Sequence, residues 1–567
     1  MKKIIIKGIA AVLIGAGMTS CSDDYLDLMP VTTVDETTVY STVEGAKLAL
    51  NGVCKAMYTQ YQDLAITPNF NGEPFFCNFY GEMLGSDAFY LVWAQRNDGT
   101  LNQWLNNTDV DGSVPGYAWR YPYNLIGQCN VILRGEETAQ GDASERAMVM
   151  AQARTIRAHA YIRLLQCFAP RWEDSDNGNK KCIVLRTEFS TADAPAVSMN
   201  EILDLVYGDL DKAIELYGKA NGQSRGFIWR PDISVAKGLY ARVAMIKHDY
   251  ATAQKMANEA RASYKIMTAD QYKSGFCEAN DEWMWANSID EQVYYWAYGS
   301  WFACDGPYPV LWGYGAGAIN YDLYKKIPTT DVRAGLYFTP ELAEKLYEEG
   351  EIGKRVSKAR FWNKIAVNPT TMSCMNGAGD MQDAVAAANH YTIPGKNLEK
   401  FGEAYANRFG QTAEKGVSIP FGAQYKFWAV DTYGRGQFPF MRASEMLLTE
   451  AEAAYHNGDM TTAKNCLKEL YDKRNPGQVC DQTGEGLLDE IRTQRRVELW
   501  GEGFCWFDLK RWNMPMVRRA WVEKDQNSNN IPQAYEITID PTHKGWKFVI
   551  PSSEYMYNHA VIRGELD

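Results

Sequence analysis

Residues 236–260 read AKGLYARVAMIKHDYATAQKMANEA, and this stretch has the pattern of two short helices joined by a tight turn. Leu239, Val243 and Ile246 recur at the three- to four-residue spacing that places side chains on one face of a helix. After the polar pair His248-Asp249, the same spacing returns with Tyr250, Ala253, Met256, Ala257 and Ala260. Small alanines at the contact allow close approach, so the stretch predicts a helical hairpin of the tetratricopeptide type.

The same pattern recurs near the end of the chain. Leu447, Ala451 and Ala454 lie on one face of a predicted helix, and the turn Asn457-Gly458-Asp459 follows it. The apolar face of the next predicted helix comprises Met460, Ala463, Leu467 and Leu470. Further helices are expected at Thr42–Gln60, Ala143–Phe168 and Ile202–Tyr217. The sequence therefore predicts an all-α fold, in which the two hairpins form a scattered repeat because they are far apart in the chain.

Long segments without periodicity interrupt the helices. Between about residues 265 and 440, Gly, Pro, Asn, Trp and Tyr become dense, and a similar stretch runs from about Thr67 to Gly116. Long loops on a rigid scaffold are where binding function usually lies. We therefore expect helical hairpins at about 42–264 and 441–513, with a loop-rich binding insertion at about 265–440.

The N-terminus has the layout of an export signal. A basic start at Lys2 and Lys3 precedes an apolar run, Ile4–Met18, that is too short to span a bilayer. The run ends at Cys21, in a sequence that resembles a lipoprotein cleavage box, and acidic residues follow at once. We predict a signal peptide at 1–20, a tether at 21–40 with lipid on Cys21, and a body at 41–567. The alternative is an ordinary secreted protein in which Cys21 carries no lipid.

Composition excludes some functions and favours others. The chain has 567 residues and a formal charge of −12, so it is poorly suited to bind nucleic acid, where phosphate neutralisation supplies most of the affinity. It contains 17 Trp and 34 Tyr, and so many amphipathic rings suggest that several face a ligand. The 12 Cys include no C-x-x-C pair, so most are expected to be buried thiols.

An ordered set of short motifs resembles the SusD/RagB family of outer-membrane nutrient-binding lipoproteins. The set spans almost the whole chain and comprises Cys21–Leu28, Arg157–Tyr161, Ala236–Leu239, Arg442–Glu445, Arg495–Trp512 and Ile550-Pro551. One departure is Asn558-His559, where the family often has asparagine-proline. In Arg495–Trp512, Arg and Glu recur at helical neighbour spacing, which indicates a structural ion-pair network rather than a ligand site.

The resemblance implies a function and a location. It implies a helical core with a loop-rich face that binds an oligo- or polysaccharide without catalysis. It also implies lipid anchoring at the outer membrane, on the cell surface, and delivery of the ligand to a SusC-like TonB-dependent transporter. Two alternatives are a peptide-binding subunit, as in the RagB branch, and a glycoside hydrolase.

Two clusters in the loop-rich segments combine flat rings with forked polar groups. Rings cover the apolar C–H faces of sugars, and Asn, Asp, Gln and Arg satisfy the hydroxyls. The first cluster begins with Phe89 and Tyr90, is followed by Trp104, and supplies the candidate ligand-binding residues Trp93, Arg96 and Asn97. The second supplies Trp296, Tyr298, Trp301, Asp305 and Trp312.

The candidate catalytic and metal-binding motifs in the sequence give little support to an enzymatic or metal-dependent function. Gly222–Gly226 fits a nucleophile-elbow string, but it follows a predicted helix and precedes Pro231, so it indicates a polar loop. The six His are scattered without metal-ligand spacing. We therefore predict no catalytic residues and no cofactor. An oxygen-rich loop is a candidate calcium site that departs from EF-hand spacing, with Asp174, Asp176, Asn177 and Asn179 as its ligands.

Overall fold

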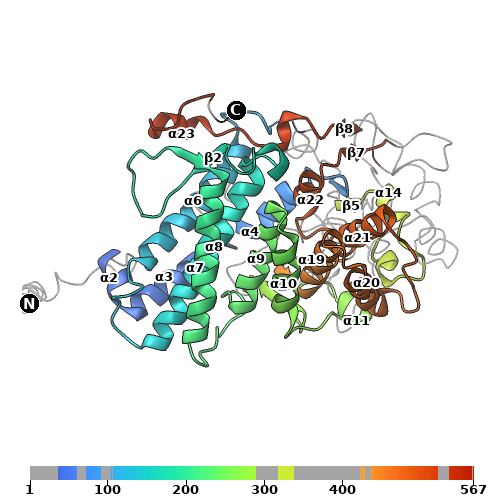
Figure 1. The fold of residues 1–567 in the computed structure, drawn as a ribbon, viewed down its shortest axis with the longest axis horizontal. Coiled ribbons are helices and arrows are strands. Elements are labelled where there is room, and N and C mark those ends of the chain that lie inside the picture. The colour runs from blue at the N-terminus through green and yellow to red at the C-terminus, as the bar shows by residue number, and fades with distance from the viewer. Residues whose placement is uncertain are drawn as a thin grey trace, which may run out of the picture.

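The computed structural model describes residues 36–59, 72–90, 104, 106–288, 317–337, 422, 424, 426–427, 436–520, 531, 536–564 and 566. Its described part is mostly helical, which confirms the predicted fold class (Figure 1). The long helices are α3 (Val43–Ala56), α6 (Ser113–Leu133), α7 (Ala143–Phe168), α8 (Met199–Lys219), α9 (Ile233–Lys247), α10 (Tyr250–Arg261), α19 (Ala443–His456), α20 (Met460–Arg474) and α21 (Glu485–Glu498).

Shorter helices connect and cover these. They are α2 (Glu36–Ser41), α4 (Gly72–Phe76), the π-helical η2 (Cys77–Glu82), η3 (Trp172–Asp174), α11 (Ala269–Tyr272), α14 (Tyr321–Tyr324), η4 (Val332–Leu336), α22 (Cys505–Arg511), η6 (Lys544–Trp546) and α23 (Ser552–Tyr557). Helix α2 lies partly within the range predicted as a tether, and its Val39 is buried.

Local sequence accounts for the helix ends. The side chain of Asp142 accepts a hydrogen bond from the backbone N–H of Glu145 at the start of α7, and Ser198 forms a capping box with Glu201 at the start of α8. Both predicted hairpin turns are present. Asp249 and Asp459 cap α10 and α20 in the same way. These caps satisfy donors that would otherwise lack partners at a helix start.

The two hairpins lie next to each other. Helix α10 packs on α9 and also on α19, which packs on α20, so α6, α7, α8, α9, α10, α19 and α20 form a continuous series (Figure 1). The two hairpins are therefore neighbours in the fold, and the prediction of a scattered repeat is wrong. The ends of the insertion meet, because β4 (Trp283–Ala286) pairs with β6 (Pro439–Arg442), and this pairing returns the chain to the helical layer.

The described strands form four two-stranded antiparallel sheets. Besides β4–β6, these are β1 (Ala88–Tyr90) with β5 (Gly317–Ile319), β2 (Lys181–Val184) with β3 (Ala196–Ser198), and β7 (Met516–Arg518) with β8 (Ile537–Ile539). Each is too small to be stable alone, so each depends on packing against the helices.

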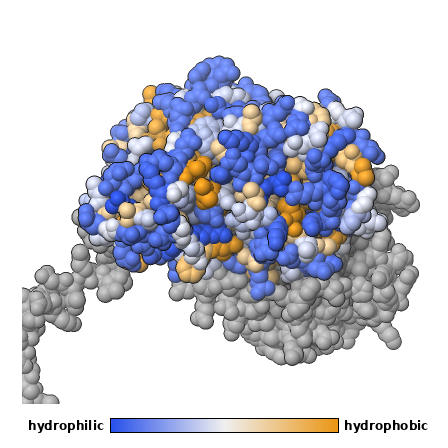
Figure 2. Space-filling model, turned by 60° about the horizontal axis from the view of Figure 1, so that its bottom comes forward, coloured by the Kyte–Doolittle hydropathy of each residue, from blue (hydrophilic) through white to orange (hydrophobic). Residues whose placement is uncertain are grey.

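Large aromatic side chains fill much of the core. Trp283, Trp285, Trp500 and Trp506 are all fully buried. Nine cysteines in the described part are free thiols and eight of these are buried, as predicted. The visible described surface is mostly hydrophilic, with small separated apolar patches (Figure 2). Within the described residues, no helix combines the length and apolar character needed to cross a bilayer.

Candidate functional site

The predicted ligand-binding residues lie outside the described residues. This applies to Trp93, Arg96, Asn97, Trp296, Tyr298, Trp301, Asp305 and Trp312, and also to Cys21. Their assignment therefore stays a prediction. The described structure instead shows the helices and strands to which the two predicted ligand segments are attached, and we call these described elements the frame.

Strands β1 and β5 connect the two predicted ligand segments. Their pairing places Tyr90 opposite Gly317 and Ala88 opposite Ile319. The first segment, 91–103, begins directly after Tyr90, and the second, 289–316, ends directly before Gly317. Trp93 and Trp312 are thus three and five residues from a paired position. Two clusters that are about 200 residues apart in sequence are attached to the frame at one place.

Asp87 fixes β1 to the frame. Its carboxylate accepts a bidentate pair of hydrogen bonds from Arg496, and its carbonyl accepts from the indole N–H of Trp500 at 2.9 Å. The same carbonyl accepts from the backbone N–H of Asn320 at 2.8 Å, which ties β1 to the residue after β5. Bidentate pairs of this kind fix orientation as well as contributing energy. The strand pair is therefore rigidly placed.

The other end of the first segment is also fixed. Trp104 has 4% of its surface exposed, and its indole N–H donates to the carbonyl of Leu84 at 3.0 Å. Its ring packs edge-on against Trp546 and Trp506, with centroids 4.7 and 6.2 Å away. Although it follows the first aromatic cluster in the sequence, Trp104 belongs to the core.

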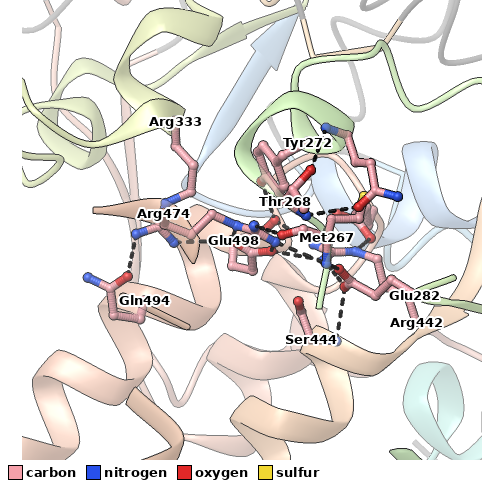
Figure 3. Close-up of polar contacts among 12 residues, drawn as sticks. Met267, Thr268, Tyr272, Glu282, Arg333, Arg442, Ser444, Arg474, Gln494 and Glu498 are labelled. Atoms are coloured by element: carbon pink, nitrogen blue, oxygen red, sulfur yellow. Dashed lines mark hydrogen bonds and ion pairs between the residues drawn. The ribbon is translucent and has the colours of Figure 1, made fainter. Parts of the chain in front are cut away.

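A buried charge network joins η4, β6, α20 and α21 (Figure 3). Glu498, at the end of α21, accepts hydrogen bonds from Arg333, Arg442 and Arg474 at 2.8–3.2 Å. Among the described residues the network is balanced, with four cations, Arg333, Lys426, Arg442 and Arg474, and four anions, Glu282, Asp331, Glu498 and Glu502. All are essentially unexposed. Balance matters because an unpaired buried charge is very costly.

The predicted ion-pair network is thus present, but its partners differ from those expected. Glu498 binds residues of η4, β6 and α20, and Arg495 pairs with Asp508 at 2.7 Å. The interactions therefore join separate elements instead of running along one helix. Sequence spacing identifies only neighbours on a helix, so it could not reveal these partners.

Burial shifts the pKa values of several network groups. Burial alone would raise the pKa of Glu498, but Arg474 and Arg442 outweigh it and hold that pKa well below its usual range. Burial lowers the pKa of Lys426 to about 8, although Glu502 opposes this. Beside the network, burial raises the pKa of Glu82 to about 8, and the nearby Asp87 adds to the rise.

The candidate calcium loop forms a self-contained turn. Asp174 binds Arg171 at 2.7 Å, and the hydroxyl of Ser175 accepts from the backbone N–H of Gly178 at 2.8 Å. Asp176 and Asn177 adopt left-handed backbone conformations. Among the described residues, no group of three or more His, Cys, Asp or Glu is arranged to hold a metal ion. The calcium site stays a prediction.

The string Gly222–Gly226 forms a turn and loop between α8 and α9. The hydroxyl of Ser224 accepts from the backbone N–H of Gly226 at 3.1 Å, two residues on. A nucleophile elbow needs a strand before the serine and a helix directly after it. The polar-loop interpretation is confirmed.

Comparisons with known proteins find similarity to SusD-like proteins. The model described as "SusD family" matches residues 389–562. A SusD-like protein of Bacteroides ovatus is 23% identical over 49% of this chain and 44% of its own length, so the chain spans less than half of that relative. SusD-like protein P38 of Formosa agariphila is 22% identical over 88% of this chain and 90% of its own length.

Solved structures show the same fold. A SusD-like carbohydrate binding protein from Bacteroides vulgatus superposes with a TM-score of 0.67 at 20% identity, covering 92% of this chain and 98% of that one. A SusD-like carbohydrate binding protein from Bacteroides fragilis gives 0.60 at 16% identity, covering 92% and 99%. The chain is thus SusD-like in its C-terminal sequence and in its fold, and the predicted resemblance is confirmed.

Proposed function

We propose that this chain is a non-catalytic glycan-binding protein that captures an oligo- or polysaccharide at the cell surface. The observation that carries the proposal is the pairing of β1 with β5, which attaches both aromatic segments to one rigid place. A sugar ring can then contact rings from both segments. Two solved structures of the same fold are described as carbohydrate binding proteins, which supports the same ligand class.

The proposal includes a location and a partner. Lipid on Cys21 anchors the chain to the outer membrane, and the bound glycan passes to a SusC-like TonB-dependent transporter. The support is the leader-like N-terminal sequence and the family resemblance. Several acyl chains would give the stable anchoring that one chain cannot.

The test replaces one ring in each predicted cluster. Trp93→Ala and Trp301→Ala are compared with Tyr557→Ala, which removes a ring that is 78% exposed at the end of α23, away from β1 and β5. Binding is measured by calorimetry with a glycan selected on an array. We expect the two Trp variants to weaken binding at least about tenfold, equivalent to about 1.4 kcal/mol, with unchanged thermal midpoints.

Unchanged affinity in both Trp variants would contradict the proposed site. A peptide library on the same array separates glycan binding from the RagB-like alternative, because peptide hits without glycan hits would reverse the assignment. Incubation with polysaccharides, followed by assay of reducing ends, tests the hydrolase alternative. Sustained release of reducing ends would show that the chain is an enzyme.

A further inference from the structure

A groove of about 660 Å³ lies where four separate segments meet. They are the residues after α7, the start of β2, the end of α22 and η6, and in Figure 1 β2 and the C-terminus lie close together at this end of the molecule. Its volume is within the range of about 300–1,000 Å³ that is usual for small-ligand sites. Among the described residues its charged lining is mostly basic, with Arg171, Lys180, Lys181, Lys510, Lys544, Lys547 and one acid, Asp174.

The positive charge of this lining is opposite in sign to the net charge of the whole chain, which is −12. The acid Asp174 is already paired with Arg171 at 2.7 Å. Lys180 and Lys544 are exposed, and neither has a carboxylate partner within the described part of the chain. Among the described lining residues, positive charges therefore outnumber negative ones, and clefts lined by one sign of charge concentrate ligands of the opposite sign.

Lys510 forms the buried wall of the groove. Its side chain is held by two hydrogen bonds of 2.8 Å that its ammonium donates to the carbonyls of Gln166 and Ala169, at the end of α7. An ammonium has three N–H donors, so one remains beyond these two. Burial lowers the pKa of Lys510 to about 7, and the neighbouring Lys547 and Arg171 add to the lowering. The cations therefore repel one another, and a bound anion would relieve that repulsion.

The groove adjoins one end of the first aromatic segment. Segment 91–103 ends at Trp104, whose ring packs against Trp546 at 4.7 Å and His543 at 6.0 Å between centroids. Trp546 and His543 both line the groove. The groove therefore lies beside the residue that directly follows the first aromatic segment in the sequence.

We propose that this groove binds the anionic groups, carboxylate or sulfate, of an acidic oligosaccharide. The inference rests on the proposed glycan-binding function and adds the charge class of the glycan. A small acidic ligand is favoured over nucleic acid, because the acidic chain as a whole would repel an extended polyanion. It is favoured over a bilayer because the cations line a hollow of limited volume.

The test reverses the two exposed lysines. The double variant Lys180→Glu and Lys544→Glu is compared with Lys255→Glu and Lys473→Glu, which makes the same charge change on exposed positions of α10 and α20. The full chain is titrated with oligogalacturonate, a sulfated chondroitin oligosaccharide, a neutral oligosaccharide and inorganic sulfate. Anionic phospholipid vesicles form a separate arm. Thermal midpoints verify folding.

We expect the unchanged chain to bind at least one acidic oligosaccharide more tightly than the neutral one, with affinity that falls as salt rises. The groove variant should lose about tenfold or more of that affinity, and the control variant should keep it. The two acidic probes distinguish a carboxylate from a sulfate ligand.

Four results would overturn the inference. One is acidic-glycan binding that survives in the groove variant; if it is lost in Trp93→Ala, the glycan-binding proposal stands while the groove assignment fails. Another is inorganic sulfate binding with no preference for acidic over neutral oligosaccharides, which would make this a simple ion site. The third is lysine-dependent binding to vesicles alone, which would assign the groove to a lipid surface. Absence of binding to every oligosaccharide would refute the proposed function as well.

Discussion

Glu498→Gln removes one negative charge from the centre of the balanced network while keeping the size of the side chain. Each carboxylate oxygen of Glu498 accepts two hydrogen bonds from arginines, at 2.8–3.2 Å. Glutamine keeps one acceptor oxygen and places an N–H₂ group against the donors on the other side. Two charge-assisted hydrogen bonds are lost, each worth about 1.5–3 kcal/mol. Breaking a buried pair in this way costs about 3–5 kcal/mol.

Such a loss is large beside the usual stability of a domain, which is about 5–15 kcal/mol. Urea unfolding followed by tryptophan fluorescence measures it, since Trp283 and Trp500 are buried close to the network. The matched control is Glu215→Gln on α8, where the carboxylate is exposed and pairs only at the surface with Lys212 and Lys219. We expect a clear fall in the unfolding midpoint for Glu498→Gln and almost none for the control.

Charge imbalance and lost packing can be separated. The double variant Arg333→Gln with Glu498→Gln restores equal numbers of positive and negative groups. If imbalance causes the loss, the double variant should be more stable than the sum of the two single changes predicts, by about 0.5–3 kcal/mol. A midpoint for Glu498→Gln no lower than that of Glu215→Gln would refute the reasoning, because the network would then contribute nothing beyond a surface pair.

Two further changes test neighbouring features of the frame. The pKa of Glu82 is raised from 4.5 to about 8 in the folded chain, so the protonated carboxyl stabilises the fold fully below about pH 4.5, and this stabilisation is lost as pH rises through 8. Glu82→Gln should therefore become more stable relative to the unchanged chain as pH rises from 5 to 8. A difference in unfolding midpoint that does not depend on pH would contradict this. In Gly81→Ala the new Cβ would lie 2.2 Å from the carbonyl oxygen of Gly503, a backbone atom that cannot move aside. The control is Gly52→Ala, where the new Cβ meets open space. We expect the thermal midpoint of Gly81→Ala to be several degrees lower than that of the control.

Periodic segments were predictable from sequence, and segments shaped by their surroundings were not. Helix α7 has the predicted bounds, Ala143–Phe168, and both hairpin turns are at the predicted residues. Helix α6 was not predicted because Pro115, Gly116 and Pro122 lie within it. Its buried faces hold it in helical form despite those residues. Strand β4 is buried at all four positions, so it lacks the alternation that marks a strand.

The candidate site was predictable only in part, for a related reason. Aromatic density singled out two segments of the sequence as candidates, but nothing in the sequence connects Tyr90 with Gly317, which pair across more than 200 residues. The basic groove gave no local signal either. Lys180-Lys181, Lys510, Lys544 and Lys547 come from three distant segments, each with only one or two lysines. A groove of this kind exists only after the segments have been folded together.

The sequence motifs that resemble the SusD/RagB family contribute charged side chains to buried ion pairs that stabilise the fold. Arg442 and Glu498 pair in the buried network, Arg495 pairs with Asp508, and Arg157 pairs with Asp209 at 2.6 Å. These arginines and carboxylates are buried within their ion pairs, so they stabilise the frame. Under the proposed function, ligand choice comes from the predicted ligand segments attached at β1 and β5 and from the basic groove, whose wall includes Lys510.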